Sequence, residues 1–151
     1  SPAGIFELGG VYGTVPAPQK KRSMPYRRIT PRDMWVDDPA SPLYNQHFVL
    51  KHDPVTPWEF KQQMKLNDYA HSLFIRHNAA DGRQKPVPGA GSSIFFHIWR
   101  RDGGAPTAGC TAMSEENLRA MIAWLDPSRH PLYILLPARE YLRLRRAWGL
   151  P

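Results

Sequence analysis

The 151-residue sequence lacks several features that each define a class of protein. It has a single cysteine, Cys110, which excludes an internal disulfide and a zinc cluster built on thiolates. It has no apolar run near about 18 residues, which excludes a membrane-spanning helix. It opens with no basic–apolar–small signal segment. What is left is a chain whose length suits one domain with one core.

Acidic residues are also scarce relative to basic ones. The 20 Lys and Arg against 13 Asp and Glu give a net charge of +7. A field of this sign attracts polyanions such as nucleic acid, anionic lipid headgroups or an anionic cell-wall polymer, and charge alone does not choose among them. Sixteen prolines and eleven glycines imply many turns, which favours a strand-and-loop fold over a helical bundle.

Hydrophobic patterning predicts short elements separated by long loops. Strands are expected over residues 5–12, 48–50, 69–77, 93–99 and 132–136, and a short strand that runs into a turn is expected over residues 35–39. Helices are expected over residues 58–66, from 114 to 126, and over 139–148. Residues 14–34, with four prolines and a Lys20-Lys21-Arg22 cluster, are expected to be a surface loop, as are residues 81–91.

Two helix starts have capping signals. Thr56 is the expected N-cap of the 58–66 helix, with Pro57 at its first position. Ser114 is the expected N-cap of the next helix, and acidic residues fill its first turn, where the helix dipole favours them. The second helix would place Leu118, Met121, Ile122 and Leu125 on one apolar face.

The only thiol lies in a turn-prone segment, thirteen positions after His97, which follows an apolar run. Thiol chemistry needs a proton acceptor and donors for an oxyanion. His97 could serve as the acceptor, and the backbone N–H groups of Gly109 and Cys110 as donors. Gly109 lacks the side chain that would block a substrate. The alternative is an inert buried cysteine, which is common.

This region resembles the YkuD domain of L,D-transpeptidases, in which a strand ends in His and is followed by a variable loop, Ser/Thr-x-Gly-Cys and a helix. The matching positions are His97, Thr107, Gly109, Cys110 and the helix from Ser114. The opening residues 1–6, Ser-Pro-Ala-Gly-Ile-Phe, resemble the family's first motif. Parts of the middle, between Trp35 and Gly91, resemble a divergent branch of the family.

The resemblance implies a mainly β fold with a few helices, a YkuD-like β-sandwich with a helix after the cysteine. It implies one catalytic domain over residues 1–151, lacking the strand or strands that precede the first motif in the family. It further implies an extracytoplasmic, bacterial location. The expected partner is the peptidoglycan stem peptide, with no nucleic acid, no metal and no organic cofactor.

By resemblance, Cys110 is the nucleophile, His97 the general base and acid, and Gly109 an oxyanion donor. The expected substrate contacts are Thr107, Ala108, Trp99 and Arg100; for Trp99 and Arg100 an ordinary exposed pair is an equal alternative. The expected reaction attacks a stem-peptide L,D-amide and passes the acyl group to the amine of another stem. An L,D-carboxypeptidase or amidase on the same scaffold, or a non-catalytic basic wall-binding module, are the alternatives.

Three departures from the family pattern bear on the substrate. The spacing from His97 to Cys110 is shorter than in the best-known members. Ala108 stands where a histidine is frequent, and Ala112 where Arg or Asn is typical. These departures leave the chemistry in place and the choice of substrate open.

The remaining polar residues are expected to be structural. His71 and His77 are expected at the surface or in secondary contacts. His47, His52 and His130 have no visible partner in the sequence. Asp37 and Asp38 are expected to form a turn before Pro39, with binding of a substrate amine as the alternative.

Overall fold

The computed structural model describes residues 1–16, 23–65, 71–81 and 84–151. The fold is mainly β with three α-helices, as the resemblance implied. The elements are β1 (Gly4–Gly13), β2 (Tyr26–Arg28), β3 (Asp33–Trp35), β4 (His47–Val49), α1 (Pro57–Gln62), β5 (His71–Ile75), β6 (Phe95–Ile98), the 3-10 turn η1 (Arg101–Gly103), β7 (Thr111–Met113), α2 (Glu115–Trp124), the 3-10 turn η2 (Pro127–Arg129), β8 (Leu132–Leu135) and α3 (Ala138–Leu144).

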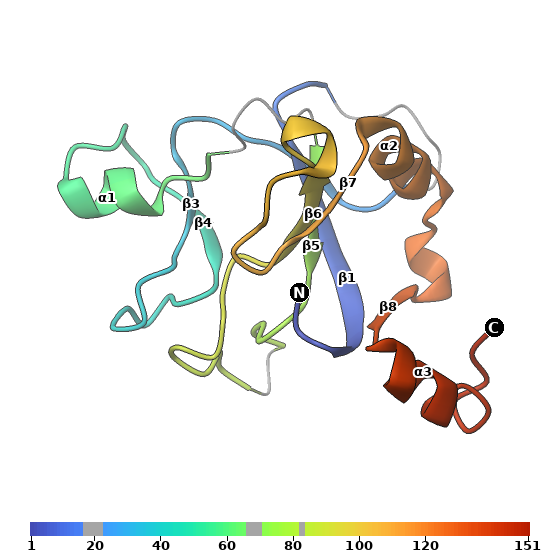
Figure 1. The fold of residues 1–151 in the computed structure, drawn as a ribbon. Helices are drawn as coiled ribbons and strands as arrows, with labels where there is room; N and C mark the ends of the chain where they lie inside the picture. Colours follow the sequence, from blue (N-terminus) through green and yellow to red (C-terminus); the bar gives the residue numbers. More distant parts are fainter. Residues whose placement is uncertain (17–22, 66–70, 82–83) are drawn as a thin grey trace.

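A six-stranded mixed sheet forms the centre of the molecule (Figure 1). Its strands follow the order β2-β1-β5-β6-β7, and β8 pairs with the first half of β1. A separate two-stranded sheet joins β3 and β4. The long strand β1 is therefore an interior strand, bordered by β5 and, along its length, by β8 and then β2.

The middle of β1 requires glycine. The pairing of β1 with β5 shifts register between Leu8 and Val11, on either side of Gly9 and Gly10. A Cβ atom at Gly9 would lie only 2.6 Å from Cδ1 of Phe74. The glycine breaks that punctuate the sequence here therefore allow an aromatic ring of β5 to lie directly against the β1 backbone.

The two faces of the sheet carry different hydrophobic clusters. Because side chains alternate along a strand, Leu73 and Phe96 point to one face while Phe74 and Phe95 point to the other. The first face packs with Leu118 and Ile122 of α2. The second face packs with the segment that contains β3, and α1 lies on that side of the molecule (Figure 1).

Both expected helix starts are confirmed. Ser114 accepts a hydrogen bond from the N–H of Asn117 at 3.2 Å and caps α2. Thr56 and Glu59 form a reciprocal capping box at α1, with Pro57 at its start. The helices α1 and α3 are shorter than expected, ending at Gln62 and Leu144.

The expectation of a loop over residues 14–34 is wrong in part. Residues 17–22 lie outside the described residues, but Tyr26–Arg28 pairs in parallel with β1, and Asp33 begins β3. The short strand β7 was also not expected. A strand of three residues shows little periodicity, and at β2 and β7 backbone pairing with a longer strand decides the structure.

Candidate active site

The pairing of β6 with β7 brings the cysteine and the histidine to one face of the sheet. These strands run parallel, with His97 opposite Ala112. Cys110 lies two residues before Ala112 and therefore faces the same side as His97. Cys110 packs against the cluster of Trp35, Phe74 and Phe95 on that face. The pairing of β6 with β7 therefore brings these two residues, which are far apart in the sequence, to the same face of the sheet.

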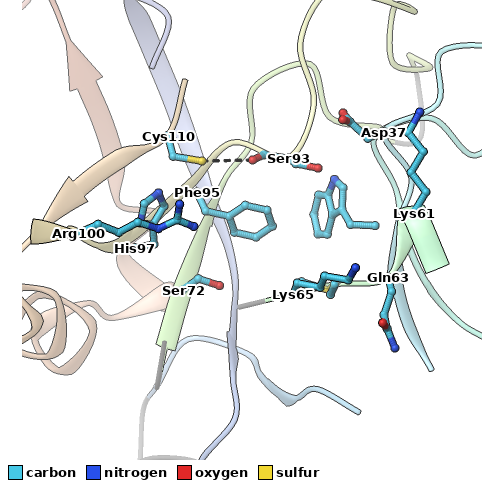
Figure 2. Close-up of a pocket in the computed structure, with 12 residues that line it drawn as sticks. Asp37, Lys61, Gln63, Lys65, Ser72, Ser93, Phe95, His97, Arg100 and Cys110 are labelled. Atoms are coloured by element: carbon cyan, nitrogen blue, oxygen red, sulfur yellow. Dashed lines mark hydrogen bonds between the residues drawn. The ribbon is translucent and has the colours of Figure 1, made fainter. Parts of the chain in front are cut away.

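Two cavities meet at this pair. The larger has a volume of about 320 Å³ and the smaller about 200 Å³. His97, Arg100 and Cys110 line both cavities. In the larger one these three lie on one side, and Lys61 and Asp37 lie on the other (Figure 2).

The imidazole of His97 is held by its own strand. Nδ1 lies 2.8 Å from the backbone oxygen of Ile98. A carbonyl can only accept, so Nδ1 carries the proton and Nε2 has the lone pair. The ring is therefore in the tautomer in which Nε2 can take a proton.

The thiol of Cys110 is half-buried and protonated at rest. Burial raises the pKa of the Cys110 thiol, and the backbone N–H of Phe95 opposes that shift only in part. The thiol donates a hydrogen bond to the carbonyl oxygen of Ser93 at 3.4 Å (Figure 2). A nucleophilic role for this sulfur therefore requires a base to remove its proton.

The turn before the cysteine is fixed by Thr107. Its hydroxyl donates to the carbonyl of Cys110 at 2.7 Å and accepts from the N–H of Gly109 at 3.3 Å. Gly109 has a φ of +133°, and a Cβ atom there would lie 3.1 Å from Cδ1 of Ile94. Only glycine adopts this conformation without strain.

A comparison with protein-family models matches residues 1–134 to the L,D-transpeptidase catalytic domain, YkuD. The chain belongs to this family. No curated protein and no solved structure matches it. The match spans both sequence blocks of this YkuD domain and ends before α3.

Three of the four predicted substrate contacts of the YkuD domain line a cavity, and Trp99 does not. Thr107 and Ala108 line the smaller cavity, and Arg100 lines both. Trp99 is 40% exposed and packs on Gly103 in η1, and it is not among the described residues that line either cavity. Gly109 is at the turn, with its N–H directed to Thr107.

The far wall of the larger cavity was foreseen from the sequence only at Asp37, the alternative binder of a substrate amine. It includes Asp37 together with Lys61, Gln63, Met64 and Lys65, which lie in or just after α1. A charged residue at the end of a short helix is an ordinary surface feature in sequence, so no signal could have singled out the last four. Asp38 does form the expected turn, accepting from the N–H of Ala40 at 3.0 Å.

Two histidines differ from expectation. His71 is buried rather than at the surface: it begins β5 opposite Gly13 of β1, and its ring lies edge-on to that of Tyr26, with 6.0 Å between the ring centroids. His47 has a partner after all: its Nε2 lies 2.7 Å from Oδ1 of the buried Asp33. His77 makes a secondary contact, from Nε2 to the carbonyl of Ala90 at 2.8 Å.

In the part of the chain that the structure describes, no cluster of three or more His, Cys, Asp or Glu side chains is placed to hold a metal ion. Over the same residues, no helix is both long enough and apolar enough to cross a membrane.

Proposed function

We propose that this YkuD domain is a cysteine-dependent acyltransferase that acts on peptidoglycan stem peptides and joins them by cross-links. The observation that carries the proposal is the shared position of Cys110 and His97. Both side chains lie on one sheet face and line both cavities, and the His97 ring is anchored through Nδ1. A peptidoglycan substrate would require the enzyme to work outside the cytoplasm of a bacterium.

In the first half-reaction, Nε2 of His97 takes the thiol proton as the sulfur of Cys110 attacks the carbonyl carbon of an L,D-amide. The carbon–nitrogen bond breaks, and His97 gives the proton to the departing amine of D-alanine. The product is a thioester on Cys110. Because the resting thiol is protonated, this proton transfer accompanies the attack.

The tetrahedral intermediate needs donors for its oxyanion. The N–H groups of Gly109 and Cys110 are the proposed donors, each worth roughly 3 kcal/mol of barrier. The N–H of Gly109 is bonded to Thr107 at rest by a long contact of 3.3 Å. The stronger acceptor, the oxyanion, would replace the threonine hydroxyl in that bond.

In the second half-reaction, an amine of another stem attacks the thioester. His97 accepts the amine proton and returns it to the departing sulfur of Cys110, which restores the resting thiol. The two cavities that meet at the thiol suit a donor and an acceptor chain. Lys61, Lys65 and Arg100 in the larger cavity suit a donor that bears carboxylates.

The decisive experiment incubates the protein with a disaccharide-tetrapeptide and identifies the products by mass spectrometry. We expect a cross-linked dimer and free D-alanine from the wild type, and neither from Cys110→Ala. His97→Gln should lose at least about a hundredfold in rate, as expected for a general base. His52→Gln, at an exposed histidine, is the matched control and should keep the wild-type rate.

The products separate the proposal from its alternatives. A hydrolysed monomer without dimer would indicate an L,D-carboxypeptidase. Full activity in Cys110→Ala would overturn the proposed mechanism. Absence of any product, with tight and salt-sensitive binding to wall material, would indicate a binding module.

A further inference from the structure

We propose that Asn45 is a positioning residue for the Cys110 thiol: its buried side-chain amide holds Ser93, whose carbonyl oxygen accepts the thiol hydrogen bond. The inference rests on the proposed nucleophilic role of Cys110. Asn45 lies in a distant part of the chain, between β3 and β4. The hydrogen bonds of its side chain go to residues other than Cys110 and His97.

Every hydrogen-bonding position of the Asn45 amide is used. Asn45 is 2% exposed. Its Oδ1 accepts from Nε1 of Trp35 at 2.9 Å and from the N–H of Ser93 at 3.0 Å. Its Nδ2 donates to the carbonyls of His77 at 3.0 Å and Asn78 at 2.8 Å. A primary amide has two acceptor positions and two donors, so this set is complete.

Ser93 depends on such a contact because its backbone is strained. Its φ is +54°, in the left-handed region that non-glycine residues avoid. Such a conformation persists only where the surroundings hold it. After Ser93 the chain is anchored by the sheet, since Ile94 accepts from the N–H of Ile75 at 3.0 Å. Asn45 supplies the anchor at Ser93 itself.

The position of the Ser93 carbonyl affects the sulfur in two ways. It fixes the direction of the thiol, at 3.4 Å. Its dipole also favours the protonated thiol over the thiolate, whereas the N–H of Phe95 favours the thiolate. Phe95 belongs to β6 and is paired with Phe74, so the sheet holds its backbone N–H.

Other charges also act on the thiol, and the variants described below leave them unchanged. Among the residues that the structure describes, the ionisable groups that face the sulfur or line its larger cavity are His97, Arg100, Asp37, Lys61, Lys65 and the amino group of Ser1. A change in the pH profile on substitution of Asn45 would therefore report the movement of the Ser93 carbonyl.

The test compares Asn45→Gly with Asn78→Gly. Both residues have a positive φ, +52° and +49°, which glycine adopts freely. The Asn78 side chain makes three hydrogen bonds with Val87 and Gly91 and none with Ser93. The readouts are the pH dependence of Cys110 alkylation by iodoacetamide, and kcat and KM for the disaccharide-tetrapeptide.

We expect Asn45→Gly to move the alkylation midpoint to lower pH, because the carbonyl that favours the thiol is released. Its kcat should fall about ten- to a hundredfold with less change in KM, as expected when a reacting group is misplaced. Asn78→Gly should keep the wild-type midpoint. A purely structural role would lower the folded fraction of both variants and leave the midpoint unchanged.

A second variant covers the case in which Asn45→Gly does not fold. Asn45→Ser keeps a hydroxyl that is too short to reach the N–H of Ser93, so the carbonyl is released as in Asn45→Gly and the midpoint should again move to lower pH. The inference is overturned if the folded variants keep the wild-type midpoint, or if Asn78→Gly shifts it as far as Asn45→Gly.

Alkylation separates this inference from the proposed function, because it needs no stem peptide. Cys110→Ala, which removes the only cysteine, gives the background. Shifts of the midpoint to lower pH in both Asn45 variants, without any acyl transfer in the wild type, would support the positioning role and overturn the proposed function. Acyl transfer by the wild type without such shifts would support the proposed function and overturn the positioning role of Asn45.

Discussion

At the scale of single residues, the turn before Cys110 is where the backbone is most restricted. Thr107 bonds to both Gly109 and the carbonyl of Cys110, and Gly109 has both a positive φ and a close neighbour in Ile94. The sulfur is thus held at the end of a four-residue turn, Thr107 to Cys110, that hydrogen bonds and the Gly109 conformation fix. Small changes in this backbone should therefore affect the chemistry directly.

We predict that Gly109→Ala lowers the rate of acyl transfer by more than about tenfold, because a Cβ atom would displace the turn. The strain should also lower the free energy of unfolding by about 1–3 kcal/mol. Gly89→Ala is the matched control, since Gly89 has a φ of +77° but open space around its Cβ position. It should cost similar stability and leave turnover unchanged. Wild-type turnover in Gly109→Ala would contradict the prediction.

The sequence made some of these residues predictable and not others. Cys110, His97 and Gly109 follow from a motif that is contiguous or separated by one loop, so the chain itself shows them together. Asn45 could not be found in this way, because its role depends on contacts with three distant segments that exist only in the folded state. An asparagine in a turn-rich segment has an ordinary explanation in sequence terms.

At the scale of elements, three short strands are joined by one buried carboxylate. Asp33 of β3 is fully buried and accepts from Arg27 of β2, from the hydroxyl of Thr30 at 2.8 Å, and from His47 of β4 at 2.7 Å. Burial alone would raise the pKa of Asp33. The hydrogen bonds from Arg27, Thr30 and His47 outweigh burial and lower the pKa to about 2.

This shift predicts a loss of stability in acid. The pKa of Asp33 is lower in the folded chain than its ordinary value of 3.8, so its contribution is complete above that value. The contribution disappears as the pH falls from about 4 through about 2, and it amounts to about 2 kcal/mol. Urea unfolding of the wild type and Asp33→Asn at several pH values measures it.

Asp33→Asn should be less stable than the wild type at pH 7, and the gap should narrow below pH 4. Asp53→Asn is the matched control, because Asp53 pairs with Arg32 at 2.7 Å at the surface and is 74% exposed there. Such a pair contributes little. An equal effect of both substitutions would show that the burial of Asp33 is not what matters.

The elements that the sequence predicted well are those with local signals. Ser114 and Thr56 mark the starts of α2 and α1, and β6 has a nearly continuous apolar run. The strands β2 and β7 could not be predicted, because three residues carry no period. They exist through pairing with β1 and β6 and through the Asp33 contacts.

At the scale of the whole molecule, one face of the sheet packs into the main hydrophobic core and the other face carries the candidate active site. One side packs against α2 and forms the larger hydrophobic cluster, built around Leu73, Phe96 and Leu118. The other side carries Cys110, His97 and the cavities. The alternation of side chains along β5 and β6 therefore lets the same strands support the core on one face and the site on the other.

Among the described residues, those of helix α3 belong neither to the hydrophobic clusters nor to the lining of the two cavities. None of its residues is buried, and in the part of the chain that the structure describes both hydrophobic clusters end by Tyr133. We therefore predict that removing residues 138–151 changes the free energy of unfolding by less than about 1 kcal/mol, as for changes at exposed sites. The pH profile of Cys110 alkylation should stay the same.

The matched comparison for this truncation is Leu118→Ala. Leu118 is completely buried in the first cluster, and its truncation should cost about 2–5 kcal/mol. Urea unfolding measures both changes on one scale. If removal of residues 138–151 costs as much as Leu118→Ala, α3 is an integral part of the folding unit. If it costs little, the folding unit ends with β8, close to where the match to the YkuD family ends.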